Sequence, residues 1–140
     1  MLACTTRRVT PRGPREMVAV PGGADEVETV VRLALTLDAA GDARADTLYA
    51  SDAMIIENAR VRLAAPRFAG IVSGKDGRIT ITSANATVEG RLAWVLVDYR
   101  WVNPAERRAE VGRATVICER RDSGWKIVHA HSSQPLPWEP

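Results

Sequence analysis

Asp98 is the residue of this sequence that is best placed for acid–base chemistry. It directly follows the apolar run 92–97, and burial among apolar neighbours raises the pKa of a carboxyl group because it disfavours the charged form. A raised pKa is what a general base for proton abstraction requires. Two other interpretations of Asp98 stay open. It could form an ion pair with Arg113 or Arg100, or it could face solvent on the outside of a sheet.

The two histidines of the chain, His129 and His131, stand two residues apart in a strand-like segment, so we expect them to share one face. Trp125 and Ile127 share that face by the same period, and Lys126 should take the solvent side. Both histidines are therefore predicted to point inward, as pocket residues or as hydrogen-bonded core residues. A metal ion would need a third ligand, and there is neither another histidine nor a clustered Cys/His spacing, so no metal site is predicted.

Trp94 and Leu96 share a face with Asp98 by the two-residue period of a strand, and we expect them to line the same pocket. A single β-bulge would bring the opposite face inward instead. Tyr49 ends a predicted short helix and Asn58 follows a predicted strand. Tyr49 either donates a hydrogen bond to a substrate oxygen or serves only in packing. The predicted catalytic residues are Asp98, His131 and Tyr49, and the predicted ligand-binding residues are Trp94, Leu96, His129, Asn58 and Arg113.

The elements that must position these residues are helical first and extended later. A long helix is predicted over 24–40, with a capping-box spacing at Asp25 and Glu28 and a C-terminal cap at Gly41. Its apolar residues recur at helical spacing. They are Val27, Val30, Val31, Ala34 and Leu37. A short helix from Asp42 to Tyr49, a strand over 53–57, a turn at Asn58 and a third short helix over 66–73 follow.

The second half of the chain has the composition of long strands. They are predicted over 78–89, 91–102, 109–121 and 125–132, with tight turns at 89–91 and 122–124. Helices that precede a run of antiparallel strands indicate an α+β fold. We therefore predict a curved, mostly antiparallel sheet that wraps around the long N-terminal helix as a cone with one open end.

The composition is that of one folded domain. The chain has 140 residues, of which 46% are hydrophobic, enough to bury a core, and no apolar run approaches the ~20 residues of a membrane span. Four arginines and one glutamate make the segment 1–23 basic, while the remainder is nearly neutral, so no nucleic-acid partner is predicted. We predict a tail over 1–23, a domain over 24–135 and a C-terminal extension over 136–140.

The start of the chain leaves its location open. Residues 1–4, Met-Leu-Ala-Cys, are similar to the end of a bacterial lipoprotein signal but lack the charged and apolar segments that precede one. The match could be chance, the sequence could begin inside a precursor, or Met17 could be the natural start. A cytoplasmic location is predicted, with an exported lipoprotein lipidated at Cys4 as the alternative. Cys118 is expected to be a buried hydrophobic residue rather than a disulfide partner of Cys4.

Three segments of the chain resemble the NTF2-like superfamily, in its SnoaL-like and DUF4440-like bacterial branch. They are 37–53, with Leu-Asp-Ala-Ala-Gly-Asp-Ala and Leu-Tyr-Ala-Ser-Asp-Ala; 88–95, Val-Glu-Gly-Arg-Leu-Ala-Trp-Val; and 124–133, Gly-Trp-Lys-Ile-Val-His-Ala-His-Ser-Ser. The last segment is also similar to the association domain of calmodulin-dependent kinase II. The resemblance implies a cone fold, with Tyr49 and Asn58 near the mouth of its pocket, and a dimer. It implies little about activity, since members include isomerases, cyclases, dehydratases, assembly hubs and transport factors.

Two functions are therefore open. The first is a binding module, a homodimer formed through the outer sheet face that holds a small apolar or aromatic molecule in the cone. The second is an acid–base enzyme of the isomerase, cyclase or dehydratase type, with Asp98 as base and a histidine or Tyr49 as partner. No cofactor is predicted, because the sequence has no phosphate loop and no dinucleotide fingerprint. A buried Asp98 without an arginine partner would favour the enzyme, and an ion-paired Asp98 would favour the module.

Overall fold

The computed structural model describes residues 23–57, 60–63, 77–105 and 107–133. An α-helix, α1 (Gly23–Ala39), is followed by a 3-10 helix, η1 (Ala43–Leu48). The strands come after them in the chain. They are β1 (Tyr49–Glu57), β2 (Arg60–Leu63), β3 (Arg78–Glu89), β4 (Leu92–Asn103), β5 (Arg108–Arg121) and β6 (Gly124–Ser133).

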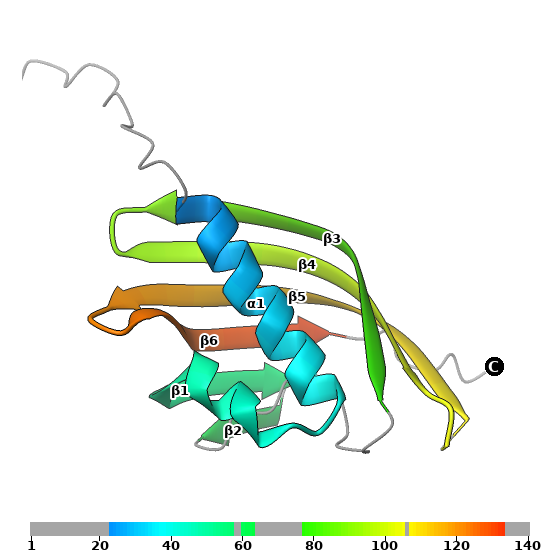
Figure 1. Ribbon diagram of the computed structural model, residues 1–140. Coiled ribbons are helices and arrows are strands. Elements are labelled where there is room, and N and C mark those ends of the chain that lie inside the picture. The colour runs from blue at the N-terminus through cyan, green and yellow to red at the C-terminus, as the bar shows by residue number, and fades with distance from the viewer. Residues whose placement is uncertain (1–22, 58–59, 64–76, 106, 134–140) are drawn as a thin grey trace, which may run out of the picture.

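The six strands form one sheet in the order β2-β1-β6-β5-β4-β3. Neighbouring strands are antiparallel except β1 and β6, which run parallel. Figure 1 shows that the sheet is bent and that α1 lies across its concave side. The predicted α+β class and the mostly antiparallel sheet around a long helix are confirmed. The short strand β2 was not predicted, and the predicted third helix over 66–73 lies outside the described residues.

The helix α1 packs its apolar side into the concave face of the sheet. Val27, Val31 and Ala34 are buried as predicted, and Val30 packs against them. Leu37 is only half-buried, and Leu35 is buried instead. The buried positions 23, 27, 31, 34, 35, 38 and 39 form one face at the helical period, turned slightly from the predicted stripe.

The two ends of α1 differ in how well they were predicted. Gly41 has a φ of 67°, and its amide donates to the carbonyl of Asp38 at 3.0 Å while the amide of Asp42 donates to that of Leu37 at 2.9 Å. This is the glycine cap that was predicted. The capping box is wrong, because the helix already begins at Gly23 and Glu28 instead pairs with Arg32 at 2.8 Å.

The two faces of β4 have opposite environments. Its odd-numbered residues lie under α1 and are buried, and its even-numbered residues lie on the outer face. The buried set is Ala93, Val95, Val97, Tyr99, Trp101 and Asn103.

Cys118 of β5 belongs to the same core. Its thiol is free, and burial raises the pKa of this thiol to about 12. It is the small buried residue that was expected.

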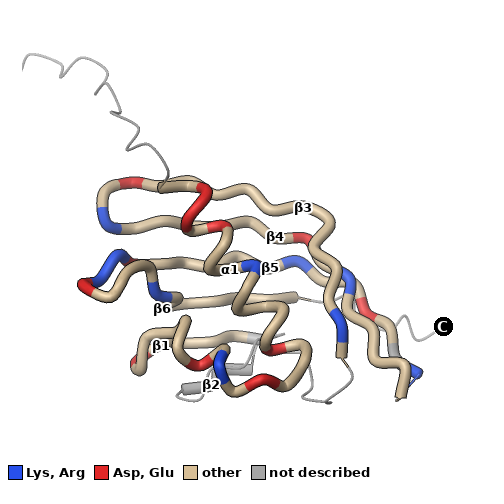
Figure 2. The backbone as a smooth tube through the Cα atoms, viewed as in Figure 1, with Lys and Arg blue, Asp and Glu red and all other residues tan. Residues whose placement is uncertain are grey.

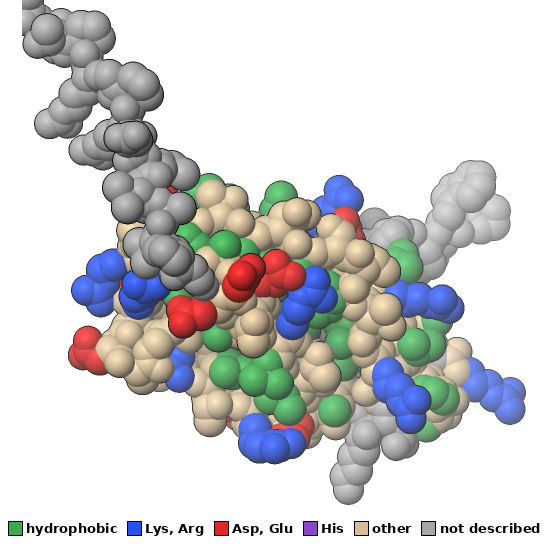
Figure 3. Space-filling view, turned by 45° about the horizontal axis from the view of Figure 1, so that its top comes forward, with side chains coloured by type: hydrophobic (Ala, Val, Ile, Leu, Met, Phe, Trp, Pro, Cys, Tyr) green, Lys and Arg blue, Asp and Glu red, His purple; other side chains and the backbone are tan. Residues whose placement is uncertain are grey.

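Charged side chains are distributed over the whole folded part. Figure 2 shows basic and acidic residues interspersed along the helix, the strands and the turns. Figure 3, which looks partly onto the helix side, shows acidic, basic and hydrophobic side chains mixed on that surface. The exposed large hydrophobic residues of the described strands lie on the other side of the sheet.

Candidate functional site

The prediction that Trp94, Leu96 and Asp98 line the interior is wrong. Trp94 is 37% exposed and Leu96 is 49% exposed on the outer face, while Asp98 is partly exposed beside them. The reason is that the even-numbered face of β4 continues into Asp98 and Arg100, whereas the odd-numbered face continues into Tyr99 and Trp101. Burying the odd-numbered face leaves both charges hydrated.

The predicted inward orientation of His129 and His131 is also wrong, although they share one face as expected. Trp125 and Ile127 are buried on the concave side as predicted. The pairing of β5 with β6 then advances by one residue on β5, from Cys118 to Ile117, but by two on β6, from Ile127 to His129. Val128 is the extra residue of this β-bulge, and it reverses the faces that follow it. His129 is therefore partly buried and His131 exposed on the outer face.

The outer face brings most of the predicted site residues together. Strand pairing sets Trp94 opposite Ile117, and Ile117 opposite His129. One row along, Leu96 lies opposite Thr115, and Thr115 opposite His131. A third row pairs Asp98 with Arg113. Six of the eight predicted residues thus share one surface, although it is the convex one.

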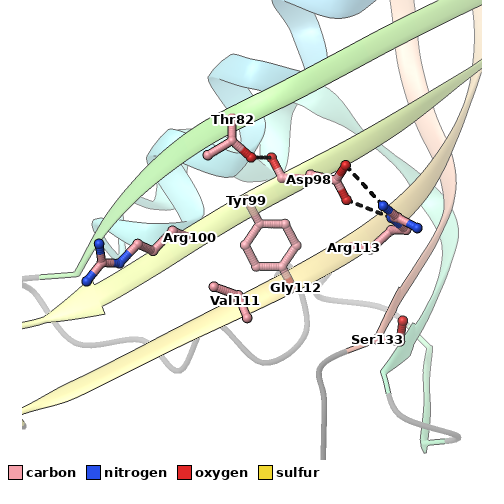
Figure 4. Close-up of a pocket in the computed structure, with 8 residues that line it drawn as sticks. All are labelled: Thr82, Asp98, Tyr99, Arg100, Val111, Gly112, Arg113 and Ser133. Carbon is pink, nitrogen blue, oxygen red and sulfur yellow. Dashed lines mark hydrogen bonds and ion pairs between the residues drawn. The ribbon is translucent and has the colours of Figure 1, made fainter.

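The Asp98 carboxylate is held by Arg113 on the neighbouring strand. Arg113 Nε donates to Oδ1 at 2.7 Å and Nη2 donates to Oδ2 at 3.3 Å. The hydrogen bonds and charge of Arg113 lower the pKa of Asp98 from its ordinary value. The pair flanks an open groove of about 600 Å³, which Arg100 also lines. Figure 4 shows that Arg100 lies across Tyr99 and Val111 from the pair and points away from Asp98. This ion pair is the arrangement that favours a binding module over a general base.

A second groove of the outer face lies over its apolar part. Its volume is about 610 Å³. It is lined by Glu89, Leu92, Trp94, Thr115 and Ile117. Only one of these five side chains carries a charge, so the groove suits apolar groups that fit around the Trp94 ring.

Tyr49 lies on the concave side, apart from the other predicted residues. It is 5% exposed, and its hydroxyl donates to Oδ2 of Asp38 at 2.6 Å. Burial and the neighbouring Asp38 carboxylate raise the pKa of Tyr49 well above its ordinary value, so the hydroxyl keeps its proton. Asp38 was not predicted. The signal was its position on the buried helical period of α1, where an acidic residue is unusual.

The remaining buried polar residues of the described chain, Asn103 and Ser132, lie on the same side as Asp38.

Asn58 lies outside the described residues. Within those residues no group of three or more histidine, cysteine, aspartate or glutamate side chains is arranged to hold a metal ion. None of the described helices is long and apolar enough to cross a membrane.

Comparison with known domains agrees with this architecture. The profile of the SnoaL-like domain matches residues 27–137. The chain belongs to the SnoaL-like family. No curated protein matches it.

Solved structures of NTF2-like proteins share the fold of this SnoaL-like domain. A proposed dehydratase from Streptomyces avermitilis has a TM-score of 0.69 and 15% identity, over 81% of this chain and 96% of that one. A proposed ketosteroid isomerase from Shewanella frigidimarina has a TM-score of 0.62 and 19% identity, over 75% and 92%. The CaMKII hub of S. rosetta has a TM-score of 0.66 and 20% identity, over 90% and 100%. At these identities the likeness establishes the fold alone.

Proposed function

We propose that this SnoaL-like domain is a homodimeric binding protein, in which two copies join through the outer sheet face and the concave side takes up a small apolar or aromatic molecule. The observation that carries the dimer is where the exposed apolar residues lie. Six large hydrophobic residues of the described chain are exposed. Five of them, Met54, Leu92, Trp94, Leu96 and Val111, are on the outer face, and the sixth, Leu33, is on α1.

An apolar surface of this kind is what a protein–protein interface covers. A second copy is the occupant we propose, because a two-fold axis would place the same apolar rows of each copy against each other. The groove around Trp94 would receive apolar side chains at the centre of the interface. The ion pair of Asp98 with Arg113, which is partly exposed, would form part of a polar rim.

The dimer is tested by measuring mass in solution for the full chain and two variants. Leu96→Arg places a charge within the outer face, and Leu33→Arg places the same charge on α1 as a matched control. Light scattering at ~50 µM, well above the dissociation constants of stable dimers, should give a dimer for the wild type and Leu33→Arg and a monomer for Leu96→Arg. A monomeric wild type, or a Leu96→Arg variant that remains dimeric with its native circular dichroism, would refute the interface.

The ligand part of the proposal is supported by the concave side. Asp38 and Tyr49 provide a buried, hydrogen-bonded pair among apolar and aromatic residues, and pockets for small molecules combine apolar walls with a few placed polar groups. The test uses 2-naphthol as a two-ring phenolic probe and follows the melting temperature. We expect 2-naphthol to stabilise the wild type and to stabilise Tyr49→Phe less. Equal stabilisation of both proteins, or none of either, would remove this part while leaving the dimer standing.

An acid–base enzyme is the second candidate, and the same pair favours it. In reaction, the Tyr49 hydroxyl, which retains its proton, would exchange its hydrogen bond to Asp38 for one to an oxygen that becomes negative. Two structural neighbours are a proposed dehydratase and a proposed ketosteroid isomerase. Isomerisation of a 3-oxo-Δ5 steroid, followed by the absorbance of the conjugated product, is the direct assay. Activity that Tyr49→Phe abolishes would support this function, and its absence would favour the binding module.

A further inference from the structure

The geometry points to a copper-binding site made by His129, His131 and Met54 on the outer sheet face. The two imidazoles come from one strand. No bulge separates them, since Ile117 pairs with His129 and Thr115 with His131 in unbroken register. Side chains two residues apart on a strand stand side by side, with Cα atoms ~7 Å apart. Two imidazoles at this spacing can approach one metal ion at the usual metal–nitrogen distance of about 2 Å.

Met54 supplies the third donor from the neighbouring strand. It pairs with His129 in the parallel ladder of β1 and β6, so its side chain lies next to that imidazole at a strand spacing of ~4.8 Å. Met54 is 41% exposed although it is a large apolar residue. Its thioether is therefore on the surface and within reach of an ion that the histidines hold.

The chemistry of the donors selects the metal. The described residues offer no third histidine, cysteine or carboxylate for such a site, so the donors are two neutral nitrogens and one soft sulfur. Such a set is poor for calcium and magnesium, which require oxygen ligands. Copper binds imidazole more tightly than the other divalent first-row metals, and a thioether favours its cuprous form. Ile117 and Ile56 flank the histidines with apolar side chains, which suits a cuprous ion of low charge.

The experiment uses the full chain without a histidine tag and with Cys4→Ser, because a free thiol would also bind cuprous ion. Cu(I) affinity is measured by competition with bicinchoninate, and Cu(II) coordination by electron paramagnetic resonance. We expect one copper per chain. His129→Asn and His131→Asn should each weaken binding by roughly tenfold or more, since each removes one of three ligands. The chain has only two histidines, so any imidazole signal must come from this pair.

Met54→Leu separates the proposed site from an incidental histidine pair. It should weaken Cu(I) binding by about tenfold while leaving the nitrogen signal of Cu(II) unchanged, because only Cu(I) gains from a thioether. Met17→Leu is the matched control and should change neither. Equal Cu(I) affinities for Met54→Leu and Met17→Leu would overturn the three-donor site. Melting temperatures without metal check that each variant is folded.

The proposal does not rest on the homodimer, although both involve the outer face. The titrations are therefore repeated with Leu96→Arg, which exposes that face if copies associate through it. Copper binding in either background that depends on the two histidines and Met54 supports the site. Absence of copper binding in both backgrounds refutes it, and the mass measurement independently decides the dimer.

Discussion

The concave and convex faces of the sheet are made by the same strands but differ in their exposure to solvent. On β4, the concave side holds Val95, Tyr99 and Trp101, which are buried under α1. The convex side of the same strand holds Leu92, Trp94 and Leu96, which are exposed although they are equally apolar. Hydrophobicity alone therefore did not select the buried face. The face that could be covered without burying charges became the core, and the other stayed exposed.

The two tryptophans of β4 give the sharpest form of this comparison. Trp101 is completely buried, and Trp94 is 37% exposed. They stand an odd number of positions apart, so they face opposite sides of the sheet. If the concave face provides stability and the convex face provides recognition, substitution of each should affect a different measurement.

Trp101→Ala should have the largest effect of the changes considered. Truncation of a buried tryptophan leaves a cavity and costs about 3–5 kcal/mol of the free energy of unfolding. Trp94→Ala should cost roughly 1 kcal/mol or less, because its surroundings are already partly hydrated. Urea unfolding of both variants in the Leu96→Arg background removes any contribution of the dimer. Similar losses for the two tryptophans would break the proposed division between the faces.

Tyr49→Phe should have an intermediate effect and tests the polar part of the concave side. The variant keeps the ring but removes the donor that contacts Asp38 at 2.6 Å. Removing the donor to a buried acceptor lowers the free energy of unfolding by about 1–3 kcal/mol, and urea unfolding measures this loss. Tyr99→Phe is not a clean control because that hydroxyl lies against Gly112, so Leu33→Arg serves as the exposed reference. No loss in Tyr49→Phe would mean that Asp38 does not depend on this hydrogen bond.

Asp98→Asn should have the smallest effect, and the size of this effect depends on pH. Because Arg113 lowers the pKa of Asp98 in the folded state, the ion pair stabilises the protein above the ordinary aspartate pKa and is lost as the pH falls through the lowered value. Asp98→Asn should thus melt slightly below the wild type at pH 7, and the difference should disappear as the pH falls through the lowered pKa of Asp98. The control is Asp122→Asn in the exposed β5–β6 turn. A difference that grows on acidification would contradict the ion pair.

The local elements of this protein could be predicted because their signals lie within a few residues of one another. The period of Val27, Val31 and Ala34 predicted α1, and Gly41 predicted its end. The bounds of β3 were predicted to the residue, and those of β4, β5 and β6 to within one residue. Patterns of apolar residues and turn glycines suffice for this, since each depends only on the geometry of its own segment.

The sequence by itself therefore determined most of the described elements, their order and the family resemblance, whereas tertiary structure decided which face of each strand is inside. The alternation along β4 shows that both faces carry apolar residues, but it does not show which face is buried. Which face is buried depends on the helix that covers it. The bulge at Val128 is a property of the pairing of β6 with its neighbours, and one inserted residue moved both histidines to the outside. The contact between Asp38 and Tyr49 likewise required α1 and β1 to be brought together, because no local pattern specifies which buried polar residues will meet.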